Sequence, residues 1–269
     1  MRVLVISDIH ANLVALESVL SAAAGRYDTI WCLGDVVGYG PRPNECVALI
    51  QQYASLCVMG NHDWVAVDLP GVDFDQFNEY ARQAMFWTRE ELNATSRDFL
   101  LHLPTMPLHP VAERSVLVTH ASPRKPVWEY IDSPEIALAN FLVFDEEICL
   151  FGHSHVQMFG LWRPLTDQMI DRRYVAVDKQ RKAMVELLLP PEIGSVLKLE
   201  TDSTFRLLLN PGSVGQPRDE DPRAAFAIFD LNAMTWQFER VEYRIEETQR
   251  QMRKARLPKE LIERLSFGY

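Results

Sequence analysis

The segment MRVLVISDIHANLVALESVL (1–20) contains an apolar run that is followed at once by polar residues. Its apolar run VLVI (3–6) has the length and the Val, Leu and Ile content of a buried β-strand. The run gives way to Asp8 and His10, polar side chains that a segment serving only a hydrophobic core does not need. An Asp-x-His pair alone is common by chance, so its meaning depends on the rest of the chain.

A helix is predicted directly after this strand. Asn12 is a suitable N-cap, and Gly25 is a suitable residue to close the helix. One apolar face is predicted to contain Leu13, Leu16, Leu20 and Ala24.

Four further apolar runs end in a polar or glycine-rich segment. They are TIWCLGD (29–35), SLCVMGN (55–61), SVLVTH (115–120) and ICLFGH (148–153). Helices are predicted over 43–53 and 73–92, and another begins at Ser133-Pro134, with proline at the first helical position. Strands that alternate with helices indicate an α/β core with parallel pairing.

The second half of the chain is predicted to be mostly strand. The apolar runs after His155 are QMFGLW (157–162), RRYVAVD (172–178), AMVELLL (183–189), SVLKLE (195–200), FRLLLN (205–210), AAFAIFD (224–230) and MTWQFERVEY (234–243). The last two are predicted to form a hairpin through Leu231-Asn232. We therefore expect a second sheet, built from the second half, that packs on the first within one domain of residues 1–269.

The charged tail, 245–269, is predicted to be helical, with a break at Pro258. We interpret it as an exposed helix or as the contact of a homodimer.

Composition narrows the classes of function. The 269 residues carry a formal net charge of -10, which disfavours non-specific binding to nucleic acid or to membranes. The 4 cysteines form no Cys-x-x-Cys pair and lie in apolar runs, as buried thiols of a reducing compartment do. No apolar run has the length of a membrane span, and the N-terminus lacks the pattern of a signal peptide. We therefore expect a cytoplasmic protein without membrane segments.

Each polar segment has an ordinary structural explanation when taken alone. Gly34-Asp35 could be a turn, Asp63 could cap a helix, and His120 could be hydrogen-bonded within the core. His153 and His155 are more specific, because side chains two apart on an extended segment point the same way.

Taken together, the polar segments predict a metal site. Five of the 7 histidines fall in them, and the segments follow strands whose carboxyl ends meet at one edge of an open α/β sheet. Aspartate, histidine and asparagine without thiolates suit Mn, Fe or Zn. The candidate ligands are more than one ion needs, so two ions that share a bridging carboxylate are expected.

The set of motifs resembles the calcineurin-like metallophosphoesterase superfamily. The matching segments are SDIH (7–10), GDVVG (34–38), GNHD (60–63), VTHAS (118–122) and GHSH (152–155). In addition, NPGSVGQPRD (210–219) resembles the bacterial branch of small phosphodiesterases and diadenosine tetraphosphate hydrolases. The resemblance implies a four-layer α/β/β/α sandwich of two packed β-sheets flanked by helices.

The resemblance also implies roles for individual residues. The first metal would be held by Asp8, His10 and His155, the second by Asn61, His120 and His153, with Asp35 as the bridge. His62 matches the catalytic histidine that binds no metal, and Asp63 would orient it. The chain departs from the family at Ala11 and Ala121, where glycine is frequent, and in the length of the segment between GHSH and NPGSVG.

Two transition-metal ions can clamp a phosphate and hold a hydroxide that attacks it. We therefore expect hydrolysis of phosphodiesters or related small nucleotides. His62 would donate a hydrogen bond to a phosphate oxygen or act as the acid that protonates the leaving alkoxide. Candidate contacts to a small anionic phosphate ester are Arg124, Trp128, Tyr130 and Arg218, although each could instead serve packing or a surface ion pair. The loop 212–215 could present backbone N–H groups to an anion or form a tight turn.

Two alternatives to a phosphodiesterase are considered. A diadenosine tetraphosphate hydrolase would attack a phosphoanhydride with the same metals. A non-catalytic scaffold would use the fold for protein binding, but such relatives tend to lose ligands that this chain keeps.

Overall fold

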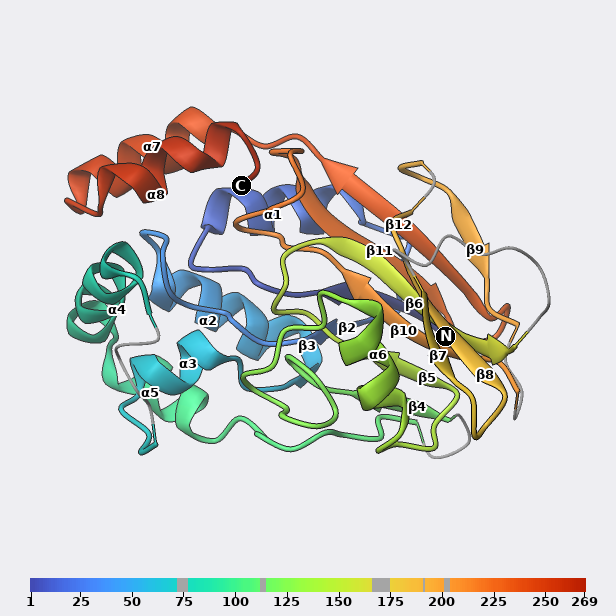
Figure 1. Ribbon diagram of the computed structural model, residues 1–269. Coiled ribbons are helices and arrows are strands. Elements are labelled where there is room, and N and C mark those ends of the chain that lie inside the picture. Colours follow the sequence, from blue (N-terminus) through green and yellow to red (C-terminus); the bar gives the residue numbers. More distant parts are fainter. Residues whose placement is uncertain (72–76, 112–114, 166–174, 191, 201–203) are drawn as a thin grey trace.

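Two six-stranded β-sheets pack face to face, with helices on their outer sides (Figure 1). The computed structural model describes residues 1–71, 77–111, 115–165, 175–190, 192–200 and 204–269. The predicted arrangement of two packed sheets flanked by helices is confirmed.

The first sheet has the strand order β3-β2-β1-β11-β12-β9. Its strands are β1 (Arg2–Ile6), β2 (Thr29–Cys32), β3 (Ala54–Cys57), β9 (Val196–Lys198), β11 (Ala224–Asp230) and β12 (Thr235–Val241). Parallel pairing joins β1, β2 and β3, whereas β11, β12 and β9 add antiparallel pairs.

The second sheet has the strand order β4-β5-β10-β6-β8-β7. Its strands are β4 (Val116–Val118), β5 (Ile148–Leu150), β6 (Gln157–Pro164), β7 (Val175–Asp178), β8 (Ala183–Leu188) and β10 (Arg206–Pro211). Residues 172–174 of the predicted strand RRYVAVD lie outside the described residues.

The prediction that the second half of the chain forms a sheet of its own is wrong. Strand β11 pairs with β1, with Arg2 opposite Asp230, so it extends the first sheet. Strands β4 and β5, from the first half and the middle of the chain, belong to the second sheet. Long-range strand pairing decides this membership, and the local sequence pattern carries no information about it.

Strand β1 is buried on both faces, which explains its continuous apolar run. Val3 and Val5 face the core between the two sheets, whereas Leu4 and Ile6 belong to the outer core beneath the helices. Two buried faces require apolar residues at every position instead of an alternating pattern.

Helices α1 (Leu13–Ala22) and α2 (Pro43–Tyr53) cover the first sheet, and α6 (Pro134–Phe141) covers the second (Figure 1). As predicted, Asn12 caps α1, because its Oδ1 accepts from the backbone N–H of Ala15 at 3.2 Å. Of the predicted apolar face, Leu16 is buried and Leu13 and Leu20 pack half-buried against the same core, whereas Ala24 is exposed. Val14, Ala15 and Val19 are buried as well.

The helix predicted over 73–92 is shorter in the structure. Helix α4 (Glu79–Glu91) begins after Asn78, whose Oδ1 accepts from the backbone N–H of Ala81. Residues 73–76 lie outside the described residues. Helix α5 (Ala94–Leu101) was not predicted. Helix α3 (Asn61–Ala66) starts within a polar motif, two residues before Asp63, the residue considered as a helix cap.

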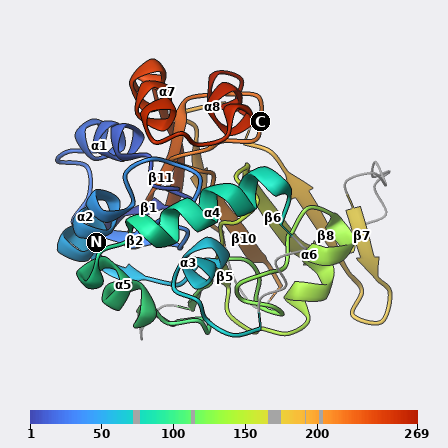
Figure 2. The same ribbon diagram turned by 90° about the vertical axis from the view of Figure 1, so that its left-hand side faces the viewer.

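The C-terminal tail packs on its own chain. It forms α7 (Ile245–Lys254) and, after the expected break at Pro258, α8 (Lys259–Glu263) and a 3₁₀ turn (Arg264–Ser266). Its side chains Met252, Leu257, Leu261, Ile262 and Leu265 are buried in one cluster with Tyr39, Ala81 and Ala84. The interpretation of the tail as simply exposed is therefore wrong. Its apolar face packs against α4, and Figure 2 shows α7 and α8 next to this helix.

All four cysteines are free, and three are buried, with Cys57 half-buried. None of the helices in the described part of the chain is long and apolar enough to span a bilayer.

Candidate metal centre

The polar residues predicted to bind metal meet at one edge of the two sheets. Asp8 follows β1, Asp35 follows β2, and Asn61 follows β3. His120 follows β4, and the histidine pair of GHSH follows β5. Parallel strands direct their carboxyl ends to the same edge, which brings these distant residues together.

Two buried groups of side chains have the composition of metal sites. The first is Asp8, His10, Asp35 and His155, and the second is Asp35, His120 and His153. Asn61 joins the second group, because its Oδ1 lies 3.3 Å from His120 Nε2. Asp35 belongs to both groups, with Oδ2 at 3.7 Å from His10 Nε2 and 3.6 Å from His120 Nε2.

Three of the imidazole rings are oriented by backbone carbonyls. The Nδ1 atoms of His10, His120 and His155 lie 3.2, 2.7 and 2.6 Å from the carbonyl oxygens of Val37, Leu33 and Gln216. A carbonyl oxygen only accepts, so Nδ1 carries the proton and Nε2 of the neutral ring presents a lone pair.

This arrangement fits a cation. The Nε2 atoms of His10 and His155 lie 2.9 Å apart, where two lone pairs would face each other. Asp8 Oδ1, Asp35 Oδ2 and His153 Nε2 are buried, and within the described residues no hydrogen-bond partner reaches them. Buried polar atoms are normally satisfied, so these three atoms are suited to binding metal ions.

The charges of the cluster also favour cations. Burial, followed by the charges of Asp63 and Asp8, raises the pKa of Asp35 well above its ordinary value. Burial and then the positive charge of Arg218 lower the pKa of His155 to about 4, so its ring is neutral at pH 7, as a metal ligand requires. Buried carboxylates that repel one another need compensating positive charge.

The backbone at the site is strained. Asp8, His10, Asp35, His153 and His155 have φ values of 54°, 49°, 54°, 64° and 62°, in the left-handed region. Non-glycine residues enter this region at an energetic cost, and such residues cluster at functional sites.

Two motif glycines are required by close approach. A Cβ atom on Gly60 would lie 2.0 Å from Asp35 Oδ1. A Cβ atom on Gly152 would lie 2.0 Å from Ser7 Oγ and 2.8 Å from Asp8 Oδ2. Both glycines therefore allow a neighbouring loop to pack against a proposed ligand.

Asp63 does not have the partner that the resemblance implied. Its Oδ1 accepts from the backbone N–H of Val37 at 3.0 Å, and its Oδ2 accepts from that of Gly60 at 3.1 Å. The ring of His62 instead has Nδ1 at 3.1 Å from Met85 Sδ. Asp63 therefore ties two ligand-bearing loops together and does not hold the His62 ring.

The backbone N–H groups of the loop 212–215 form hydrogen bonds within the protein. The N–H groups of Val214 and Gly215 donate to the carbonyl oxygens of Ser7 and Asp8, each at 3.0 Å. The N–H of Gly212 donates to Asn210 Oδ1 at 2.8 Å. Since these donors are occupied, the alternative of a tight turn describes the loop better than an anion-binding one.

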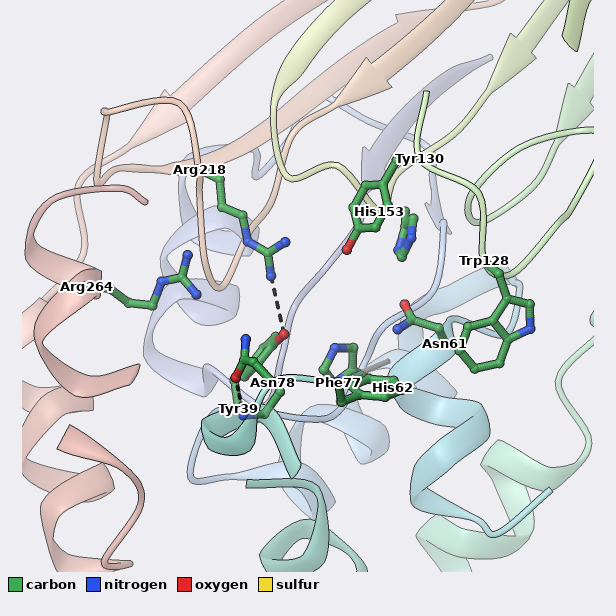
Figure 3. A pocket seen from close by; sticks show the side chains of 11 residues that line it. Tyr39, Asn61, His62, Phe77, Asn78, Trp128, Tyr130, His153, Arg218 and Arg264 are labelled. Carbon is green, nitrogen blue, oxygen red and sulfur yellow. Dashed lines mark hydrogen bonds between the residues drawn. The ribbon is translucent and has the colours of Figure 1, made fainter. Parts of the chain in front are cut away.

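A cavity of about 300 Å³ opens beside the second group of ligands (Figure 3). It is lined by Tyr39, Asn61, His62, Phe77, Asn78, Ala81, Trp128, Tyr130, His153, Arg218 and Arg264. Of the four predicted substrate contacts, Trp128, Tyr130 and Arg218 line this cavity, and the Tyr130 ring stacks on His153 with centroids 3.9 Å apart. Arg124 does not line it, and its guanidinium lies 3.5 Å from Glu129.

Sequence reasoning missed five other residues of the lining, namely Tyr39, Phe77, Asn78, Ala81 and Arg264. Tyr39 follows the motif GDVVG directly, and Phe77-Asn78 precedes the start of α4, so position in the sequence could have suggested them. Nothing in the tail distinguishes Arg264 from its other basic residues.

Comparison with known proteins identifies the family. The sequence model of the calcineurin-like phosphoesterase superfamily domain matches residues 1–234. This chain belongs to that superfamily. A metallophosphoesterase from Sphaerobacter thermophilus, known from a crystal structure, is 44% identical with a TM-score of 0.81, covering 100% of this chain and 99% of the other. The protein is thus a metal-dependent phosphoric ester hydrolase of a family that uses two metal ions.

Two further relatives differ in how much they share with this phosphoesterase. An uncharacterized protein of Methanocaldococcus jannaschii is 35% identical, over 98% of this chain and 97% of the relative. A symmetrical bis(5'-nucleosyl)-tetraphosphatase of Aliivibrio salmonicida is 24% identical, over 51% of this chain and 50% of the relative.

Proposed function

We propose that the protein hydrolyses phosphodiesters or related small nucleotides at a dinuclear Mn, Fe or Zn centre. The main support for this proposal is that the cavity and the cluster of proposed ligands have lining residues in common. Asn61 and His153 belong to both, so a phosphate in the cavity would lie against the proposed ligands.

The donor set favours a particular division of ligands. Asp8, His10 and His155 would hold one ion, and Asn61, His120 and His153 the other, with Asp35 between them. When bound, such ions neutralise phosphate oxygens and lower the pKa of water toward neutrality.

His62 is proposed to donate a proton to the leaving group of the substrate. Its backbone N–H donates to Asp35 Oδ1 at 2.8 Å, which places the residue beside the proposed bridge, and its side chain lines the cavity. Burial and then the charge of Arg218 lower the pKa of His62 well below its ordinary value. A bound anion would oppose this shift, so the ring could take up a proton and pass it to the leaving alkoxide.

Aromatic side chains of the same cavity could bind the remainder of the substrate. Trp128 and Phe77 meet edge to face, with ring centroids 6.4 Å apart, and both line the cavity. Aromatic faces of this kind stack on nucleobases, which supports a nucleotide-like substrate.

A second candidate is the hydrolysis of dinucleoside tetraphosphates, the activity named for the Aliivibrio salmonicida relative. The ligand set does not distinguish it from a phosphodiesterase, because both reactions attack phosphorus.

A turnover panel with added Mn²⁺ tests both. It should contain p-nitrophenyl mono- and diesters, cyclic nucleotides and diadenosine tetraphosphate, with an Asp35→Asn variant as the control for contaminating enzymes. Faster turnover of diesters than of the tetraphosphate supports the first proposal, and the reverse order supports the second. No turnover above the control with any substrate would refute both.

A further inference from the structure

The cavity holds two arginines on one side, and one of them comes from the C-terminal tail. Figure 3 shows Arg218 and Arg264 together, across the cavity from Asn61, His153 and Trp128. Arg264 lies beyond the matched family segment, which ends at residue 234.

The tail is held firmly enough to present this side chain. Leu261, Ile262 and Leu265 flank Arg264 in sequence and are buried in the same cluster as Tyr39 and Ala81. Tyr39 and Ala81 also line the cavity, so the packing that fixes the tail fixes Arg264 at the cavity wall.

Neither guanidinium has an ion pair with an aspartate or glutamate within the described part of the chain. Arg218 Nη2 lies 3.1 Å from Gln216 Oε1 and 3.4 Å from Tyr39 Oη, and its buried Nε has no hydrogen-bond partner among those residues. Arg264 Nε donates to the backbone oxygen of Tyr269. By contrast, Arg240 lies between Asp219 and Asp221.

The two arginines also repel each other. Burial lowers the pKa of Arg264, and the positive charge of Arg218 lowers it further. Two like charges beside one cavity, neither in an ion pair with an aspartate or glutamate, are stabilised when an anion lies between them. Guanidinium groups suit phosphate in particular, because their N–H groups match its oxygens in pairs.

We infer that Arg264, with Arg218, forms a subsite for a second phosphate group, next to the phosphate that is hydrolysed. The inference rests on the proposed function and narrows it, because it assigns the substrate to compounds with at least two phosphate groups. A simple diester such as bis(p-nitrophenyl) phosphate would leave this subsite empty.

Calorimetry of the Mn²⁺-loaded protein tests the subsite without turnover. The probes are inorganic phosphate, imidodiphosphate, whose P–N–P link resists hydrolysis, and the longer tripolyphosphate, each titrated with Mn²⁺ in excess. We expect at least one of the two longer probes to bind more tightly than phosphate. Arg264→Gln should remove about tenfold to a hundredfold of that affinity and leave phosphate binding unchanged, since a charge-assisted contact is lost.

Two further variants separate the subsite from general effects. Arg253→Gln changes an exposed arginine of the same tail and should bind all three probes like the wild type. Arg264→Lys keeps the charge and should restore part of the affinity. Melting temperatures of all variants, measured alongside, show whether the tail remains packed.

Three outcomes decide the matter. The subsite is supported if a folded Arg264→Gln variant no longer binds the longer probe more tightly than phosphate. This holds even if no substrate of the turnover panel is hydrolysed. If neither longer probe binds more tightly than phosphate, or if the advantage survives Arg264→Gln, the inference is wrong. If the inference is wrong but diesters are hydrolysed, the proposed function is still supported.

Discussion

The Nε2 atoms of His10 and His155 lie 2.9 Å apart, although 145 positions separate the two residues in the sequence. Each ring is held by a carbonyl oxygen at Nδ1, so a lone pair on each Nε2 faces the other. A structure that keeps two such atoms this close needs positive charge between or beside them.

Metal content provides the first test. Protein purified without chelator should contain about two transition-metal ions per chain, the number that the shared carboxylate implies. Chelation should lower the melting temperature, because Asp8 and Asp35 would then lose their compensating charge. Asp35→Asn should be the most damaging ligand substitution, because a neutral amide is a poor bridge. Protein that takes up only one ion would rule out the two-metal site.

His62→Ala should separate chemistry from metal binding. The variant should keep both ions and a melting temperature near that of the wild type, while turnover of alkoxide esters falls by roughly 10²–10⁴. The loss should be smaller for p-nitrophenyl esters, because p-nitrophenolate needs little protonation. His153→Ala is the matched control and should lose metal together with activity. If His62→Ala lost metal to the same extent, its assignment as a non-ligand would be incorrect.

Asp63→Ala should destabilise the protein and loosen its metal centre. The substitution leaves the N–H groups of Val37 and Gly60 without their acceptor, at about 1–3 kcal/mol for each buried donor. Chemical denaturation and elemental analysis measure the two effects. A variant of wild-type stability and metal content, but with slow turnover, would instead favour the orienting role that the resemblance implied.

Gly152→Ala should remove metal although glycine supplies no ligand atom. The new methyl group would meet Ser7 Oγ and Asp8 Oδ2 and displace the Asp8 side chain. Gly160→Ala is a suitable control, because the three atoms nearest to its new Cβ would all belong to Leu208, the nearest being Cβ at 3.2 Å. Equal metal content in the two variants would show that the loop accommodates the extra atom.

Trp128→Ala should raise KM for nucleotide substrates by roughly tenfold or more, the scale of one lost stacking contact. KM for p-nitrophenyl phosphodiesters should change much less. The Trp128 ring also meets Trp64, with centroids 6.3 Å apart, so stability must be measured in parallel. Equal increases in KM for both substrate types would indicate that Trp128 only packs the fold.

The local parts of the fold were predictable because their causes are local. The apolar run of β1, the Asn12 cap and the proline at the start of α6 each depend on a few neighbouring residues. The convergence of Asp8, Asp35 and the motif histidines was predictable for a related reason. Residues at the carboxyl ends of parallel strands share one edge, whichever loops follow them.

Which partners these residues contact depends on the tertiary structure. The pairing of β11 with β1 and the Asp63 bonds to two loops depend on chain segments that no local pattern relates. Arg264 reaches the cavity only because the apolar face of the tail packs on Tyr39 and α4. The residue types of the motifs indicate the type of chemistry. Packing determined the shape and charge of the cavity beside them, because those depend on contacts between segments far apart in the chain.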